Sequence, residues 1–128
     1  MSGRRISGGG PWEARYGYSR VALAGDAAYV AGTTDAGPDG RSLHPGDPGA
    51  QARAILRIIE AALADAGFSL SDIVRTRMFV TDRGNIAPVA EVHGEVFREI
   101  RPASTVVVVE GLIEPSLLVE IEADARRV

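Results

Sequence analysis

The chain has 128 residues and a formal net charge of −3, with 45% hydrophobic and 24% charged residues. This length and composition are typical of one soluble globular domain rather than a disordered chain. All 14 cationic residues are Arg, which excludes chemistry that needs a Lys amine, such as Schiff bases and P-loops. The lack of Cys excludes thiol nucleophiles, disulfides and thiolate metal sites.

Only His44 and His93 supply imidazole, so a His-rich metal centre within one chain is excluded, and we expect neither a metal nor a cofactor. No apolar run approaches the roughly 20 residues of a membrane span, and no apolar stretch follows the N-terminus as in a secretory signal. We therefore expect a cytoplasmic protein with no membrane partner. The acidic balance also predicts that it has no nucleic-acid partner.

In chain order, residues 1–11 are rich in Gly, Ser and Arg and predict a loosely held start. Residues 18–23 and 27–33 have the character of strands, separated by a turn at Gly25-Asp26. A loop rich in Pro and Gly runs to Asp47-Pro48, an N-cap followed by Pro at the first helical position. Apolar residues at helical spacing then predict a helix over 48–66, ended by Gly67.

The second half of the chain predicts a strand over 73–80, a turn over 82–85 and a helix over 86–99. Two strands close the chain, over 104–109 and 117–125. Both helices are long enough to cover one face of a single sheet, which indicates an α+β fold. We expect one domain that spans residues 1–128.

Four short segments resemble those of a known family. They are Gly17-Tyr18-Ser19, Val30-Ala31-Gly32, the run from Arg75 to Asp82, and Glu120-Ile121-Glu122-Ala123. Their order and spacing over nearly the whole chain resemble the Rid/YjgF family, formerly called endoribonuclease L-PSP. The resemblance implies a chorismate mutase-like fold: a single six-stranded mixed sheet with two helices on one face, assembled as a homotrimer. The best-known members hydrolyse reactive enamines and imines to ketoacids and ammonia.

Side chains alternate across a strand, so each of two strands presents an apolar set and a polar set. The apolar sets, expected to face the helices, are Val74, Thr76, Met78 and Val80, and Val119, Ile121, Ala123 and Ala125. The opposite sets are Arg75, Arg77 and Phe79, and Glu120, Glu122 and Asp124. This polar face is either solvated, with ion pairs worth about 0–1 kcal/mol each, or joined to other subunits in the barrel that the family trimer implies. In the trimer, Val106 and Val108 are expected to add apolar area to it.

The resemblance also implies site residues. Glu120 matches the family Glu that positions the hydrolytic water, and it is the expected catalytic residue. Tyr18 matches a Tyr that lines the cleft between subunits, although a strand-edge aromatic is an equal alternative. Ser104 and Thr105 are further expected substrate-binding residues, and Ser104 stands where the family has the Arg that binds the substrate carboxylate.

A Ser hydroxyl cannot form the bidentate, charge-assisted pair of a guanidinium, so we expect weak activity on 2-aminoacrylate. Two alternatives follow for the ligand. Arg77 or Arg75 substitutes for the missing Arg, or the ligand is not a simple amino-acid imine. A purely structural pairing of Arg77 with Glu122 is as good an interpretation of Arg77 as a binding role.

Three other side chains are assigned structural roles. His93 shares an apolar helical stripe with Val89 and Phe97, which favours packing over catalysis. His44 falls in a loop rich in Pro and Gly and is expected to be solvated. Trp12 is expected to anchor the N-terminal segment.

The leading hypothesis is a Rid-like hydrolase that adds water to an imine, enamine or related small metabolite by general acid–base catalysis at Glu120. The alternative is a non-catalytic trimer of the same fold that binds a small molecule or acts as a regulator. Ribonuclease activity is a third possibility. The acidic net charge and the absence of Lys disfavour it, since phosphate contacts dominate affinity for nucleic acids.

Overall fold

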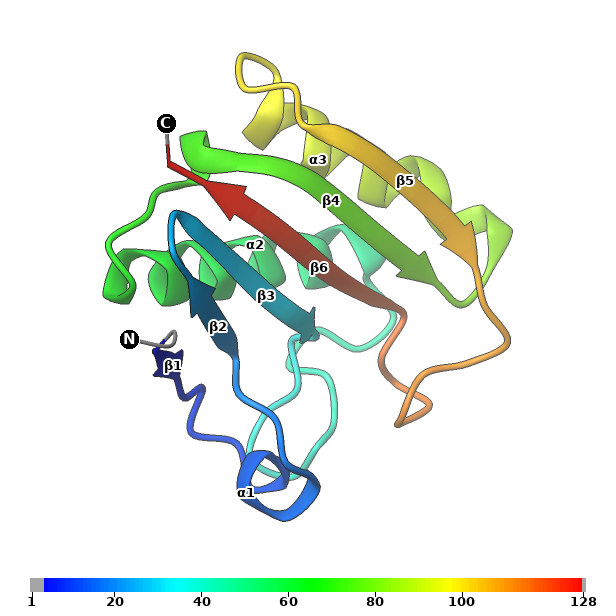
Figure 1. Ribbon diagram of the computed structural model, residues 1–128. Helices are drawn as coiled ribbons and strands as arrows, with labels where there is room; N and C mark the ends of the chain where they lie inside the picture. The colour runs from blue at the N-terminus through cyan, green and yellow to red at the C-terminus, as the bar shows by residue number, and fades with distance from the viewer. Residues whose placement is uncertain (1–3, 128) are drawn as a thin grey trace.

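A computed structural model describes residues 4–127, which form one six-stranded mixed sheet in the order β1-β2-β3-β6-β4-β5 (Figure 1). The strands are β1 (Arg5–Ile6), β2 (Val21–Ala24), β3 (Ala27–Thr33), β4 (Ile73–Val80), β5 (Ala103–Val108) and β6 (Val119–Arg126). β4 and β5 run parallel, and the other neighbouring strands are antiparallel. The sheet expected from the resemblance is therefore confirmed.

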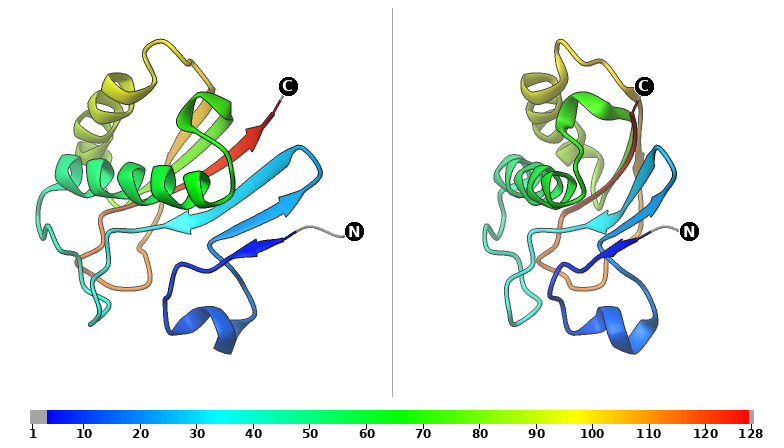
Figure 2. Two further views of the ribbon diagram at one scale, coloured as in Figure 1. Left: turned by 90° about the vertical axis from the view of Figure 1, so that its left-hand side faces the viewer. Right: turned by 60° about the vertical axis from the view of Figure 1, so that its left-hand side comes forward.

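The helices are α1 (Trp12–Tyr16), α2 (Pro48–Asp65) and α3 (Ile86–Phe97), with 3₁₀ turns at Leu70–Asp72 and Arg83–Asn85. α2 and α3 cover the same face of the sheet, which leaves the other face open (Figure 2). The predicted start of α2 is confirmed, because the side chain of Asp47 accepts a hydrogen bond from the N–H of Ala50 at 3.0 Å. α1 lies at one end of the sheet, away from the two long helices.

The hydrophobic core lies between the sheet and the two long helices. Ile55, Ile59 and Leu63 of α2 are fully buried, as are Val119 and Ile121 of β6. β6 alternates strictly between buried and half-buried residues from Val119 to Ala125. Its predicted division into an apolar and a charged face is confirmed, and that division makes the open face of the sheet polar.

The prediction that Val74 faces the helices is wrong. A β-bulge shifts the pairing of β4 with β6 between Ile73 and Arg75, so that Ile73 is buried and Val74 is 48% exposed. A bulge inserts one extra residue into a strand and so reverses the side-chain alternation before it. From Thr76 onward, β4 follows the predicted alternation.

The placement of Val106 and Val108 on the open face is also wrong. In the register of β4 with β5, Met78 is opposite Val106 and Val80 is opposite Val108. Since residues paired directly across a sheet point to the same face, both valines lie on the side of the helices, and Val106 packs against the core. Val107 is the valine that this register places on the open face.

The start of the chain adds two elements that the sequence pattern did not predict. The pairing of Arg5 with Ala22 and of Ile6 with Val21 forms β1, and α1 holds Trp12 stacked on Tyr16 with ring centroids 5.5 Å apart. Residues 1–11 were predicted to be loosely held, and residues 1–3 of this segment lie outside the described residues.

A buried Gln on α2 connects two long loops. The Nε2 amide of Gln51 donates to the carbonyls of His44, at 3.1 Å, and Ser116, at 3.0 Å. Its Oε1 accepts from the N–H of Leu118 at 2.9 Å. Gln51 is fully buried, so these three bonds satisfy the polar atoms of its side chain within the protein. The side chain thus ties the loop before α2 to the loop before β6.

His44 is not simply solvated, as its loop composition had suggested. Its Nδ1 lies 3.0 Å from Oδ2 of Asp35, a carboxylate that is 1% exposed. The same oxygen accepts from the hydroxyl of Ser42 at 2.8 Å. The imidazole is therefore part of a polar cluster that fixes the shape of the loop, although its side chain is still 44% exposed.

The Gln51→Leu variant should lose about 2–4 kcal/mol of folding free energy, because it removes the hydrogen-bond partner of three backbone groups in two loops. Chemical denaturation followed by circular dichroism measures this loss. Arg57→Leu, on the exposed side of the same helix, is the control and should change stability by about 0.5 kcal/mol or less. Equal effects of the two variants would contradict a connecting role for Gln51.

Candidate functional site

The open face of the sheet carries a line of paired charges on β4 and β6. The register places Arg77 opposite Glu122 and Arg75 opposite Asp124. Nη1 of Arg77 lies 3.2 Å from Oε1 of Glu122 and 3.5 Å from Oδ2 of Asp124. Within one chain, Arg77 therefore has the structural pairing that was one interpretation of its sequence position. The arginine is 41% exposed, so each pair is worth about 0–1 kcal/mol.

Glu120 lies on the same face, where its carboxylate packs directly over the backbone of β3. A Cβ atom at Gly32 would come within 2.6 Å of Oε2 of Glu120. The register of β3 with β6 is interrupted between Val30 and Thr33, beside this contact. Gly32 is therefore needed for the close approach of the carboxylate to the backbone.

Arg20, just before β2, completes this part of the face and was not among the residues predicted from the sequence. Its Nη1 donates to the carbonyl of Gly32 at 2.8 Å and to the hydroxyl of Thr33 at 2.9 Å. These bonds hold the irregular end of β3 in place. They also bring a positive charge close enough to act on the ionisation of Glu120.

The pKa of Glu120 is raised above its ordinary value. Burial is the largest cause, because it disfavours the charged form, and the neighbouring charge of Glu122 adds to the effect. The guanidinium of Arg20 acts in the opposite direction and lowers the same pKa. A carboxyl group with a raised pKa accepts and returns protons closer to neutral pH than an ordinary Glu.

The other sequence-predicted site residues fall in different places. Thr105 is opposite Arg77 in the register of β5, so it shares the open face with Glu120 and Arg77. Tyr18 precedes β2 at the end of the sheet where Gly32 and Glu120 lie, with its side chain 42% exposed. Ser104 is on the opposite face, because it is paired with the buried Thr76. One chain therefore does not bring Ser104 to Glu120.

Ser104 instead belongs to a cluster of hydroxyl and imidazole groups beneath α3. The hydroxyl of Thr76 lies 2.8 Å from Nε2 of His93 and donates to Oγ of Ser104, also at 2.8 Å. The ring of His93 packs on Phe97 with centroids 4.6 Å apart, and burial lowers the pKa of His93. His93 thus packs as predicted, but it also forms a polar contact that helical periodicity did not indicate.

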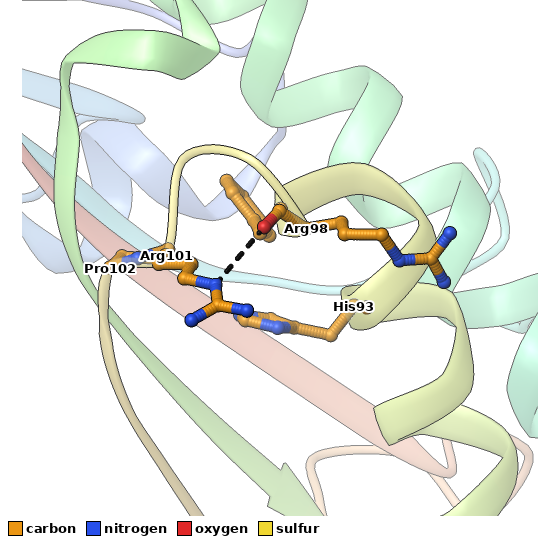
Figure 3. A pocket seen from close by; sticks show the side chains of 6 residues that line it. His93, Arg98, Arg101 and Pro102 are labelled. Carbon is orange, nitrogen blue, oxygen red and sulfur yellow. Dashed lines mark hydrogen bonds between the residues drawn. The ribbon is translucent and has the colours of Figure 1, made fainter.

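A cavity of about 310 Å³ adjoins this cluster (Figure 3). It lies between the C-terminal half of α3 and the segment that leads into β5. Its lining residues are His93, Gly94, Phe97, Arg98, Arg101 and Pro102. Among residues 4–127, no three His, Asp or Glu side chains are placed to hold a metal ion, and no helix is long and apolar enough to cross a membrane.

The sequence model of the Endoribonuclease L-PSP family matches residues 11–127, almost the whole chain. The chain belongs to this family. The resemblance to Rid/YjgF proteins expected from four short segments is thereby confirmed. In this L-PSP family protein, Glu120 and Gly32 both lie in segments that carried that resemblance.

Solved structures and sequence relatives agree with this assignment. The L-PSP family protein is 46% identical to Rv2704 of Mycobacterium tuberculosis, a member of the YjgF/YER057c/UK114 family, with a TM-score of 0.88 over 98% of this chain and 100% of that one. It is 35% identical to the RutC family protein PH0854 of Pyrococcus horikoshii over 84% of this chain and 85% of the relative. It is also 29% identical to E. coli TdcF with bound serine, with a TM-score of 0.78 over 98% of this chain and 94% of that one.

Two substitutions should move the pKa of Glu120 in opposite directions. Arg20→Gln should raise it further, because the variant removes the charge that favours the ionised carboxylate. Glu122→Gln should lower it, because a like charge is lost. Carboxyl carbon chemical shifts recorded against pH by NMR measure both changes. Arg77→Gln is the control and should shift this pKa less than Arg20→Gln does, and shifts of the same sign in the Arg20 and Glu122 variants would contradict the assignment.

Proposed function

We propose that this protein is a homotrimeric hydrolase of small imines or enamines and that Glu120 transfers the protons of the reaction. The observation that carries the proposal is the carboxyl group of Glu120, half-buried against Gly32 with a raised pKa. By the family resemblance, it matches the Glu that positions the hydrolytic water in Rid proteins. General acid–base catalysis works best when the catalytic pKa lies near the working pH.

The proposed reaction consists of two balanced steps. In the first, the ionised Glu120 takes a proton from water as the water oxygen bonds to the C=N carbon, and it returns this proton to the nitrogen. In the second, Glu120 takes the hydroxyl proton of the resulting carbinolamine and delivers it to the nitrogen. The C–N bond then breaks to release ammonia and leave a carbonyl group. Glu120 ends in its starting state, so neither a covalent intermediate nor an oxidant is required.

The open face of the sheet supports the proposed trimer. Besides its ion pairs, this face presents Tyr29, which is 47% exposed, and Val107, which is 42% exposed. A sheet covered by helices on one side commonly meets another subunit on its other side. Packing of three such faces would bury these side chains and exclude water from around Glu120, which strengthens the electrostatic effects that raise its pKa.

The first test of this proposal is the assembly. At micromolar concentration, light scattering or native mass spectrometry should give the mass of three chains. The expected cause is burial of the apolar part of the open face, worth roughly 25 cal/mol for each Å² of apolar area removed from water. A stable monomer at that concentration would contradict both the trimer and any site shared between subunits.

The second test compares two carboxylates on the same face. Glu120→Gln should abolish ammonia release from freshly generated imines, because Gln keeps the size of Glu but cannot accept a proton.

The melting temperature of the Glu120→Gln variant at pH 8 should not fall. Folding raises the pKa of Glu120, so its protonated form stabilises the folded state at pH values below the unfolded pKa. This contribution is lost as the pH rises through the folded pKa. Gln carries no titrating proton, so the variant has no such loss at pH 8.

Glu122→Gln is the matched control for the rate. Glu122 pairs with Arg77, and its substitution should cost some stability while it preserves most of the activity. It should also shift the pH–rate profile to lower pH, because it lowers the pKa of Glu120. If the two variants lose activity equally, the proton-transfer role does not belong to Glu120 alone.

A non-catalytic role in small-molecule binding is the second candidate. It is favoured by Ser104, which occupies the place of the family's carboxylate-binding Arg and is bonded to Thr76 on the helix side. Ammonia release from 2-iminopropanoate separates the two functions. A pure trimer that binds ketoacids but does not accelerate this reaction would favour the binding role over the hydrolase.

A further inference from the structure

Residues 7–18, the α1 segment, are joined to the rest of the protein by very little buried surface. Between Ser7 and Tyr18 every residue is exposed except Glu13, which is 7% exposed. The segment lies beyond one end of the sheet, apart from α2 and α3 (Figure 1). A segment with so few buried contacts opens with little free energy. Glu13 is therefore the residue that anchors the α1 segment to the fold.

The anchor depends on Gly8, which lies between the carboxylate of Glu13 and the side chain of Arg20. The N–H of Gly8 donates to Oε2 of Glu13 at 2.8 Å. A Cβ atom at Gly8 would come within 2.9 Å of the same oxygen and within 3.1 Å of Nε of Arg20. Real Cβ atoms do not make contacts as short as the first of these. Only a residue without a side chain therefore lets Glu13 and Arg20 pack on the two sides of this position.

On its other side, Arg20 holds the end of β3 against which Glu120 packs. Its Nη1 donates both to the carbonyl of Gly32 and to the hydroxyl of Thr33. Among residues 4–127, Arg20 forms no ion pair, so no carboxylate in contact neutralises its charge. The charge acts on Glu120 instead, where it favours the ionised carboxylate.

The other charges near Glu120 have no connection to the α1 segment. Glu122, on the same strand, raises the pKa of Glu120. On the side of β4, the residue opposite Glu120 is the uncharged Phe79, and the nearby Arg77 is paired with Glu122 and Asp124. Arg20 is therefore the one charged group that links the ionisation of Glu120 to the α1 segment.

We propose that Arg20 is a positioning residue for Glu120, and that the α1 segment, through Glu13 and Gly8, holds Arg20 where it acts. The proposal rests on the proposed function, because it assigns control of the proton-transferring carboxylate to a peripheral segment. With the segment in place, Arg20 is held against β3 and favours the form of Glu120 that accepts a proton from water. Displacement of the segment releases Arg20, and Glu120 then stays protonated to higher pH.

The same displacement would also move Tyr18, an expected substrate-binding residue. The N–H of Tyr18 donates to the backbone carbonyl of Glu13 at 3.0 Å, as does the N–H of Gly17 at 2.9 Å. Glu13 thus fixes Tyr18 through its backbone and Gly8 through its side chain. One movement of the α1 segment would change both the wall of the site and the charge state of its carboxyl group.

The test replaces two glycines of the α1 segment in the intact protein. Gly8→Ala places a methyl group against Glu13 and Arg20 and should displace Arg20 from β3. The variant should raise the pKa of Glu120, in the direction expected for Arg20→Gln, as measured by carboxyl carbon chemical shifts against pH. Gly10→Ala is the matched control. Its Cβ would lie 3.8 Å from Oε2 of Glu13, an ordinary contact, and should leave the titration of Glu120 unchanged.

Variants of Glu13 separate its hydrogen bond from its charge. Glu13→Ala removes the acceptor of the Gly8 N–H and should shift the titration of Glu120 as Gly8→Ala does. Glu13→Gln removes the charge but keeps a carbonyl oxygen for this N–H, and it should restore most of the original titration. A titration of Glu120 that is unchanged in Gly8→Ala and Glu13→Ala, or shifted equally in Gly10→Ala, would overturn the proposal.

Turnover provides a readout that a general loss of folded protein would not give. In Gly8→Ala, imine hydrolysis should fall more at about pH 6 than at about pH 8, because Glu120 stays protonated to higher pH. Hydrolysis with the same pH profile in both proteins sinks this inference and leaves the role of Glu120 intact. A shifted titration of Glu120 in a protein that shows no hydrolysis sinks the proposed function and supports the coupling.

Discussion

The strict alternation of side chains along β6 is the constraint on which the rest of this structure depends. β6 lies between β3 and β4, so its apolar side chains contact the core from the middle of the sheet. The same geometry places Glu120, Glu122 and Asp124 together on the open face. Core and candidate site are therefore two sides of one strand. A shift of its register by one residue would bury three carboxylates and expose the centre of the core.

The sequence predicted the fold well wherever the hydrophobic period was regular. The helices and β6 follow from such periods, and Glu120 follows from the family resemblance. The errors lie where local geometry breaks the period: the bulge that turns Val74 outward has no marker in the residues around it. The face of Val106 could not be predicted either, because the register of a parallel pair depends on a crossover through α3. A five-residue helix such as α1 is too short to show a period.

The candidate site was only partly predictable for a related reason. Arg20 immediately follows the Gly17-Tyr18-Ser19 segment, one of the four that carried the family resemblance, and that proximity was the available signal. Its effect on Glu120 depends on the irregular end of β3, which only the three-dimensional structure reveals. The contact of Thr76 with His93 likewise joins β4 to α3, across 17 positions of sequence.

The hydrogen bonds of Gln51 have a consequence for how this protein can be changed. Loops usually tolerate insertions because their ends are fixed and their middles are free. Here the side-chain amide of Gln51 donates to a carbonyl in each of two loops, at His44 and at Ser116. A change in the length of the loop at His44 would therefore displace the amide that also holds the loop at Ser116. The two loops therefore form one structural unit. Engineers who graft new loops onto this scaffold should exchange them as a pair, with Gln51 retained.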